Sequence, residues 1–224
     1  MLADAIGKML PAAMAIALTP IQIVAAVVVL GGRHGRAGGF AFLTGWLVAL
    51  GALVTVTMLL VEKLGESDRT PTPLLHWLQL TAGLLLLAMA MRMWRRRPND
   101  SEEPATPKRL ASLGEAGPVG AFMAGASTAA ANPKIIALVL SSATSFAYLV
   151  FSAWQLAAIA ILFVLLGSAP LISLVVAHAT GGPATASRIR DFKGFMLRHN
   201  DVILTVVLAM LGVSVLGNGV SGLR

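Results

Sequence analysis

The sequence predicts an all-α integral membrane protein with six transmembrane helices arranged as a 3+3 inverted repeat. Apolar residues make up 57% of the 224 residues and charged residues only 12%, whereas soluble domains are roughly one-quarter charged. Long apolar segments recur six times along the chain. The first and fourth of these segments are interrupted by prolines, Pro20 and Pro133. We therefore expect the first and fourth helices to be broken at these positions.

The six predicted spans are apolar runs separated by charged or Gly/Pro-rich segments. They cover approximately residues 9–31, 38–62, 74–94, 118–146, 152–177 and 200–220. All six are expected to be helices, because runs of this length lack the alternating pattern of barrel strands. The first run has no basic segment before it and continues to Leu30, so we expect an uncleaved first span.

The basic residues predict the orientation of the spans. Most of the 17 lysine and arginine residues fall in the loops after the first, third and fifth spans, whereas the other two loops hold only Lys63 and Arg69. By the positive-inside rule, the three basic loops are cytoplasmic and both termini are outside. The net charge of +7 therefore reflects membrane orientation. Nucleic acid is not expected as a partner.

The domain organisation follows from one long hydrophilic segment. Residues 95–117 contain prolines and mixed charges without apolar periodicity, which predicts a flexible cytoplasmic linker. The linker separates a first three-helix repeat at 1–94 from a second at 118–224. Pro20 and Pro133 stand 113 residues apart, and this offset also maps the second span onto the fifth. Because each half has three spans, the halves are expected to run in opposite directions, as in many transporters.

Each proline break frees backbone groups that need new partners. Proline has no N–H, so Pro20 and Pro133 leave the carbonyls of Ile16 and Ala129 without their usual donors. Broken helices in membranes occur where they are buried in protein or line a cavity. A proline kink in a tilted, continuous helix is the alternative. The matched proline in each half favours paired broken helices.

Lys134 is the candidate residue with the clearest chemistry, because it is a charge placed inside a predicted span. No acidic residue is predicted well inside any span, so the ammonium group needs another partner. An anionic substrate group is the natural one, and the start of the half-helix after Pro133 would add to the attraction. Alternatively, Lys134 extends to water or contacts backbone carbonyls.

Three polar neighbours complete the candidate site. Asn132 is placed to cap the half-helix that follows Pro133, and Thr19 to cap the one that follows Pro20. Gln22 offers an amide at matching depth. For each of these three a structural role competes with substrate contact. The candidate substrate-binding residues are therefore Lys134, Asn132, Pro133, Thr19, Pro20 and Gln22.

Several other kinds of site are not expected. The chain has no cysteine, which excludes disulfides and thiolate metal sites. Spans without carboxylates do not suit Mg²⁺, Ca²⁺ or Mn²⁺, nor a proton relay of membrane acids. The four histidines lie near span ends without metal-ligand spacing. No phosphate-binding loop or catalytic constellation is visible, so we expect neither an enzyme nor a cofactor.

Short segments along the whole chain resemble one family of membrane proteins. They are Ala17-Leu18-Thr19-Pro20-Ile21-Gln22-Ile23-Val24, Phe42-Leu43-Thr44-Gly45-Trp46, Arg92-Met93-Trp94-Arg95-Arg96-Arg97-Pro98, Asn132-Pro133-Lys134 and Phe195-Met196-Leu197-Arg198-His199-Asn200. In order and spacing they resemble the glycopeptidolipid- and sulfolipid-addressing proteins, called GAP or Sap-like, of the lysine-exporter (LysE) superfamily. The resemblance extends from about residue 5 to residue 222.

The resemblance implies a six-helix fold of the secondary-transporter type and a role in moving envelope glycolipids across the inner (plasma) membrane of mycobacterial-type bacteria. It nominates Thr19, Pro20, Asn132, Pro133 and Lys134 as the central site. The expected partners are a membrane lipid or glycolipid substrate, and a homodimer or larger envelope-lipid export machinery. Two alternatives remain. One is an exporter of amino acids or other small solutes, and the other is a non-transporting accessory protein of a lipid-export complex.

Overall fold

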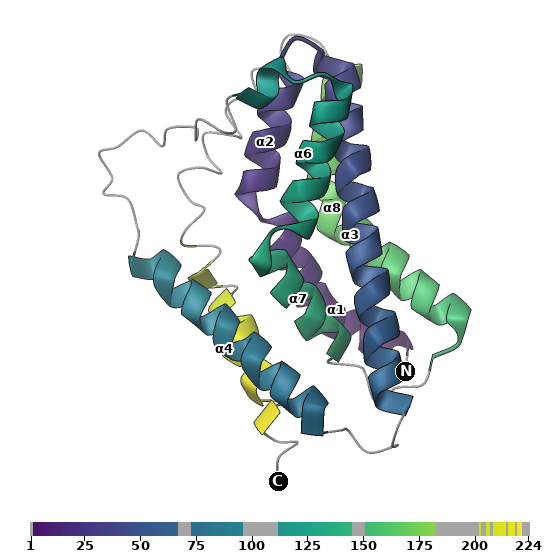
Figure 1. The fold of residues 1–224 in the computed structure, drawn as a ribbon, viewed down its shortest axis with the longest axis vertical. Coiled ribbons are helices and arrows are strands. Elements are labelled where there is room, and N and C mark those ends of the chain that lie inside the picture. The colour runs from purple at the N-terminus through teal and green to yellow at the C-terminus, as the bar shows by residue number, and fades with distance from the viewer. Residues whose placement is uncertain are drawn as a thin grey trace.

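The described part of the protein is helical. The structure, a computed structural model, describes residues 2–66, 73–95, 112–144, 151–181 and most of 202–220. Within these residues the chain forms α-helices and one 3-10 turn, with no strand. Figure 1 shows the helices gathered into an elongated bundle, with α4 on its flank. The all-helical class predicted from the sequence is confirmed.

The first predicted span consists of two helices. α1 (Leu2–Ala17) ends before Thr19, and α2 (Pro20–Leu30) begins directly after it. The chain bends by 49° between them. Proline is well suited to the first position of a helix, because its missing N–H would have no partner there and its φ is already helical. The bend therefore lies where the local sequence favours a new helix start.

The fourth predicted span has the same construction. α6 (Pro118–Ala130) and α7 (Pro133–Thr144) are separated by Ala131 and Asn132, with a bend of 54°. As in the first pair, the second helix begins at a proline. The two bends thus have similar angles and the same local cause.

Three further helices are continuous. They are α3 (Gly35–Glu66), α4 (Pro73–Arg95) and α8 (Ala153–Thr180). Each is long and apolar enough to cross a membrane. If each bent pair is counted as one span, the described residues hold up to five candidate spans. The sixth predicted span, 200–220, is described only in part. It contains a shorter apolar helix at Leu208–Gly217.

α3 and α6 cross with their backbones in close approach. A Cβ added to Gly45 would lie 2.1 Å from the carbonyl oxygen of Phe122, and one added to Gly125 would lie 2.0 Å from that of Phe42. Because the obstacle is backbone in both cases, neither glycine can be replaced without moving a helix. Small residues at such crossings allow membrane helices to approach closely.

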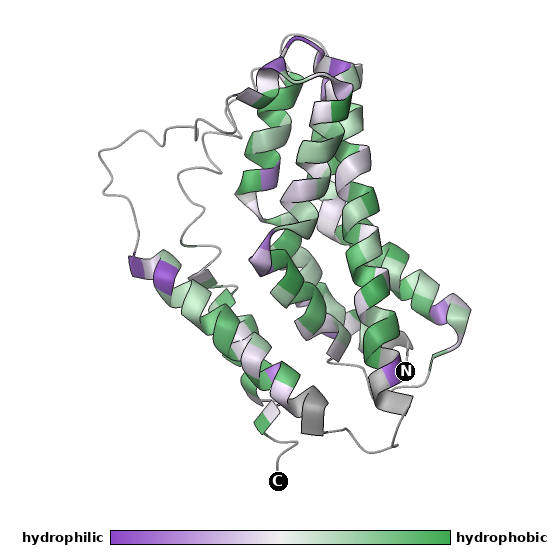
Figure 2. Cartoon of the chain, in the orientation of Figure 1, coloured by the Kyte–Doolittle hydropathy of each residue, from purple (hydrophilic) through white to green (hydrophobic). Residues whose placement is uncertain are grey.

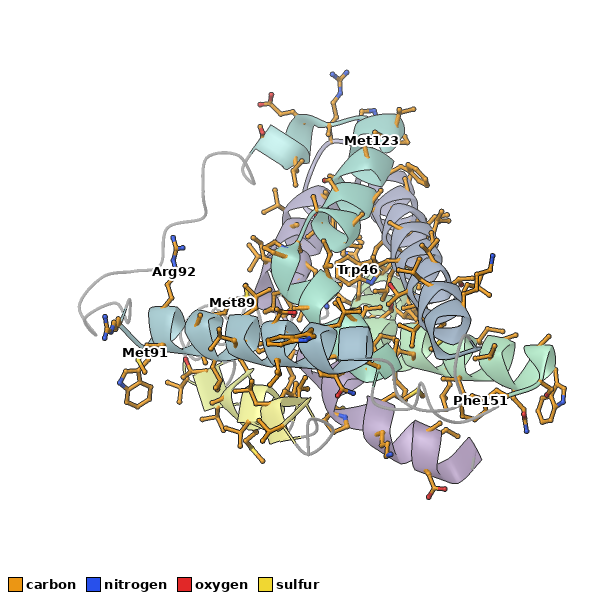
Figure 3. The ribbon with its side chains drawn as sticks, turned by 60° about the horizontal axis from the view of Figure 1, so that its bottom comes forward. Trp46, Met89, Met91, Arg92, Met123 and Phe151 are labelled. Carbon is orange, nitrogen blue, oxygen red and sulfur yellow. The ribbon has the colours of Figure 1, made fainter. Side chains whose placement is uncertain are left out.

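α8 makes the corresponding contact with α1. A Cβ on Gly167 would lie 3.3 Å from a side-chain carbon of Ile16, and α8 also packs against α3 and α2. α3 and α8 therefore each cross the first helix of the bent pair in the other half of the chain. Trp46 of α3 is fully buried in this central region, as Figure 3 shows.

α4 and the C-terminal helical segment lie side by side (Figure 1). A Cβ on Gly83 would lie 3.0 Å from the carbonyl oxygen of Gly212, so the two helices also approach through small residues. α4 reaches the bundle through α7. The buried Gln79 side chain donates a 3.1 Å hydrogen bond from Nε2 to the carbonyl oxygen of Thr144, at the end of α7.

The linker predicted at 95–117 is described only at its end. Residues 96–111 lie outside the described residues, but Ser112–Glu115 form a 3-10 turn, η1, that the sequence analysis did not predict. The backbone N–H of Arg33 donates a 3.0 Å hydrogen bond to the carbonyl oxygen of Gly114. This end of the linker therefore contacts the turn after α2.

The distribution of hydropathy matches a membrane environment. Many large apolar side chains are exposed on the outer faces of the helices, among them Val48 and Val56 on α3, Leu84 on α4 and Ile161 on α8. A soluble monomer rarely exposes so much apolar surface. Figure 2 shows hydrophobic residues along the helices and hydrophilic residues near the end of the bundle formed by the α2–α3 turn and η1. Hydrophilic residues also occur where α2 and α7 begin.

Candidate functional site at the two helix breaks

The two bent pairs pack against each other in opposite directions. α1 contacts α7, and α2 contacts α6. The helix before the first break therefore meets the helix after the second break. Likewise, the helix after the first break meets the helix before the second. Figure 1 shows both breaks in the middle part of the bundle. The two bent pairs are therefore antiparallel neighbours.

At the first break, the last carbonyls of α1 find partners in two ways. The Met14 carbonyl keeps the regular helical hydrogen bond, of 2.9 Å, from the Leu18 N–H. The Ile16 carbonyl, which Pro20 deprives of its usual donor, accepts 3.0 Å bonds from the Thr19 N–H and from Gln22 Nε2. This arrangement satisfies the requirement that buried carbonyls find partners inside the protein.

Thr19 does not cap α2 as predicted. Its hydroxyl group donates a 3.0 Å hydrogen bond back to the carbonyl of Ala15, and its side chain makes no capping bond to α2. A threonine hydroxyl can bond backwards to the carbonyl four residues earlier as well as forwards to a helix start, and at Thr19 the backward bond forms. The buried Thr19 side chain therefore stabilises the end of α1.

Gln22 is the most unusual polar residue at the first break. Its side chain is 0% exposed, and its amide nitrogen is bound to Ile16, but its Oε1 has no hydrogen-bond partner. Leaving a buried acceptor unpaired costs about 1–3 kcal/mol. An oxygen in this state is available for a ligand.

At the second break, Asn132 caps α7 as predicted. Its Oδ1 accepts a 3.1 Å hydrogen bond from the backbone N–H of Lys134, and its carbonyl accepts another from the Ile136 N–H. These are the bonds expected of a residue directly before a helix. Pro133 supplies the first helical residue and has no donor to satisfy.

The Lys134 side chain is only 7% exposed, in the first turn of α7. Within the described residues, no carboxylate forms an ion pair with its ammonium group, in agreement with the lack of acidic residues inside the spans. Removing a charge from water without a partner is costly. This lysine is therefore a candidate contact for an anionic group.

Several polar residues of this region were missed by the sequence analysis. They lie on α7 and on the face of α4 that meets it, and all are buried: Ser141, Ser142, Thr144 and Gln79. The Ser142 hydroxyl has no hydrogen-bond partner. A signal was present in the sequence, since Ser141 follows Lys134 by seven residues and so shares its helix face.

The structure thus places the six candidate residues at two breaks whose helices contact one another. Thr19, Pro20 and Gln22 belong to the first break, and the Asn132-Pro133-Lys134 segment belongs to the second. Among the described residues, no group of three or more His, Cys, Asp or Glu side chains is placed to hold a metal ion. The available chemistry is one ammonium group, amide groups and hydroxyl groups.

These features define a multi-pass helical membrane protein with polar groups at paired helix breaks. The family of Sap, sulfolipid-1-addressing protein, matches residues 9–221, and the chain belongs to this family. The resemblance to the Sap-like family, noted from its short motifs, is thereby confirmed. No curated protein and no solved structure gives a significant match to the chain. Membership in a lipid-addressing family and the apolar helices together indicate a membrane protein that is involved in lipid handling.

Proposed function

We propose that the chain is a translocator of anionic envelope lipids or glycolipids across the bacterial inner membrane, and that the lipid headgroup binds between the two broken helices. The observation that carries the proposal is the buried Lys134 side chain at the second break, without a carboxylate partner in the described residues. A sulfate or phosphate headgroup supplies the missing negative charge. The family match supports a lipid as the molecule that carries it.

The ammonium group, rather than backbone amides, is the main anion contact in this proposal. Pro133 has no N–H, and the N–H of Lys134 is already bound to Asn132. The start of α7 therefore offers fewer free amides than a helix start usually does. The helix dipole still favours negative charge there. A single ammonium near a helix start suits a headgroup with one strongly anionic group.

We include an inverted repeat of 1–94 and 118–224 in the proposal. It is supported by the bends of 49° and 54° at equivalent prolines and by the reciprocal packing of α3 on α6 and α8 on α1. In transporters built this way, the substrate site lies near the bilayer midplane between the repeats. The position of both breaks in the middle of the bundle fits such a site (Figure 1).

The proposed orientation has the basic loops in the cytoplasm and both termini outside. In support, the turn after α2, the end of α8 and η1 gather at one end of the bundle, where Gly35 lies near His178 and Gly32 near Gly114. Acyl chains would remain in the bilayer beside the protein while the headgroup passes the site. A large enclosed cavity is therefore not required.

The test compares surface lipids and secreted amino acids in cells with the wild-type chain, with Lys134→Ala, or without the chain. We expect Lys134→Ala to lose the surface lipid as the deletion does, although it reaches the membrane in normal amount. Lys134→Arg keeps the charge and should retain part of the activity. Lys63→Ala, which removes an exposed lysine near the end of α3, serves as the matched control and should behave as wild type.

Two results would contradict the proposal. Unchanged surface lipids with altered amino-acid efflux would identify an exporter of small solutes. A non-transporting accessory protein would be identified by two results together: lipid export stays normal in Lys134→Ala, and lipid export is lost after changes in the 95–117 linker.

A further inference from the structure

We propose that the end of α1 and the side chain of Gln22 form a binding site for a monovalent alkali-metal cation. This site is distinct from the anion contact at Lys134, and it would supply a coupling ion in a chain whose spans lack acidic residues. It goes beyond the proposed lipid translocation, since a cation can bind here whatever the transported molecule is.

The unpaired oxygen of Gln22 lies at the end of α1. Gln22 Nε2 donates a hydrogen bond to the carbonyl of Ile16, in the last turn of α1. Oε1 belongs to the same amide group, so it lies at this end of α1 too. A helix C-terminus carries a partial negative charge from its carbonyls. An unpartnered, fully buried oxygen at that end has two costs, its own desolvation and repulsion from the negative helix end. Both costs are removed when a cation or a donor binds it.

The orientation of the amide cannot relieve this cost. If the two ends of the Gln22 amide exchanged places, the oxygen would face the Ile16 carbonyl and Nε2 would take the unpartnered position. Two acceptors would then oppose each other, which is worse than the present arrangement. The bond to Ile16 therefore fixes which end of the amide is unpaired, and that end is the buried Oε1.

Comparison with the second bent pair indicates that Gln22 is not needed for packing. Gln22 stands two residues after Pro20, and Ile135 stands two residues after Pro133. Both side chains are 0% exposed. The second break thus fills the equivalent buried position with an apolar side chain. The amide at the first break has a desolvation cost that an apolar side chain in the same position would not have. A bound ion offsets this desolvation cost.

The available ligands select the kind of ion. The Thr19 hydroxyl donates to the carbonyl of Ala15, and the Gln22 amide donates to the carbonyl of Ile16, so both side chains lie at the carbonyl end of α1. The oxygens of these groups are all neutral. Divalent cations such as Ca²⁺ and Mg²⁺ require carboxylates, whereas Na⁺ in transporters is coordinated by carbonyls and the C-terminal ends of broken helices. The ammonium of Lys134 does not bind Gln22 Oε1, which remains without a partner.

The test measures thermal unfolding of the full chain in lipid nanodiscs, with NaCl or choline chloride at equal ionic strength. We expect Na⁺ to raise the melting temperature saturably, by at least ~2 °C. Gln22→Met removes the oxygen, so the melting temperature of this variant should be the same in both salts. Gln79→Met, which removes another buried glutamine, should keep the full Na⁺ effect although its melting temperature is lower.

Lys134→Ala separates this proposal from the proposed function, because it should lose lipid export and keep the Na⁺ effect. If Gln22→Met does not fold, hydrogen exchange of the wild-type chain provides the readout: Na⁺ should slow exchange in residues 15–24 more than in residues 128–137. Equal melting temperatures in NaCl and choline chloride for the wild type would overturn the cation site. A full Na⁺ effect in Gln22→Met, or exchange slowed equally at both breaks, would overturn it too.

Discussion

The indole Nε1 of Trp46 donates a 3.0 Å hydrogen bond to the hydroxyl oxygen of Ser168, and both side chains are fully buried. The bond joins α3 to α8, one long helix from each half of the chain. Without it, the indole N–H would be an unpaired donor in the centre of the bundle. Trp46 and Ser168 are therefore a specific polar connection between the two halves.

We predict that Trp46→Phe and Ser168→Ala each lower stability by about 0.6–1.7 kcal/mol, the range for hydrogen bonds between membrane helices. The melting temperature in detergent should fall by ~2–4 °C per kcal/mol. Because both variants break the same bond, the double variant should lose less than the two single losses combined. Fully additive losses would show that the hydrogen bond contributes nothing beyond packing.

Replacement of Gly45 by alanine should separate α3 from α6. Its new Cβ would meet the backbone of Phe122 at 2.1 Å, so the helices must move apart, at a cost of about 1–3 kcal/mol or more. Gly51 lies on the same helix with nothing within 4 Å of an added Cβ. Gly51→Ala should therefore be neutral or stabilising by up to ~1 kcal/mol. Equal melting temperatures for the two variants would contradict the close crossing.

Asn132 should contribute to stability as a helix cap. Asn132→Ala removes the acceptor for the Lys134 N–H and should destabilise the protein by about 1 kcal/mol. Asn132→Ser keeps a side-chain oxygen that can accept the same hydrogen bond. Its stability should therefore be close to that of the wild type and above that of Asn132→Ala. Melting temperatures of the three chains decide the point. If serine is no better than alanine, the amide of Asn132 has a role other than capping.

Cysteine labelling should reveal the orientation, since the natural chain has no cysteine and gives no background. Arg36 and Lys63 are exposed near opposite ends of α3. A membrane-impermeant thiol reagent should label Lys63→Cys in intact spheroplasts, and Arg36→Cys only after the membrane is opened. The reverse pattern would invert the proposed topology.

The helix starts at Pro20 and Pro133 and the cap at Asn132 could be predicted because their causes are local. Proline has no N–H, and an asparagine placed before a helix has few other backbone donors within reach. The role of Thr19 was predicted wrongly for a related reason. Its side chain can bond either backwards or forwards along the chain, and which bond forms depends on how the end of α1 is surrounded.

The candidate site could be predicted only as a set of residue types. Lys134 was identified because a charge in an apolar segment needs a partner, and Gln22 because it is polar at the same depth. The unpaired oxygen of Gln22 and the unpaired hydroxyl of Ser142 could not be predicted. Their state depends on which neighbouring helices offer donors, and that information is not contained in the local sequence.

The sequence by itself determined the membrane class, the approximate helices and the positions at which two of them begin anew, because hydropathy and the missing proline N–H act within a few residues. Tertiary structure decided the rest. It formed the hydrogen bond between Trp46 and Ser168, and it placed Gly45 directly beside the backbone of Phe122. It also turned Gln22 toward the end of α1. The reason is that close packing and the pairing of buried polar groups depend on residues far apart in the chain, which only the folded bundle brings together.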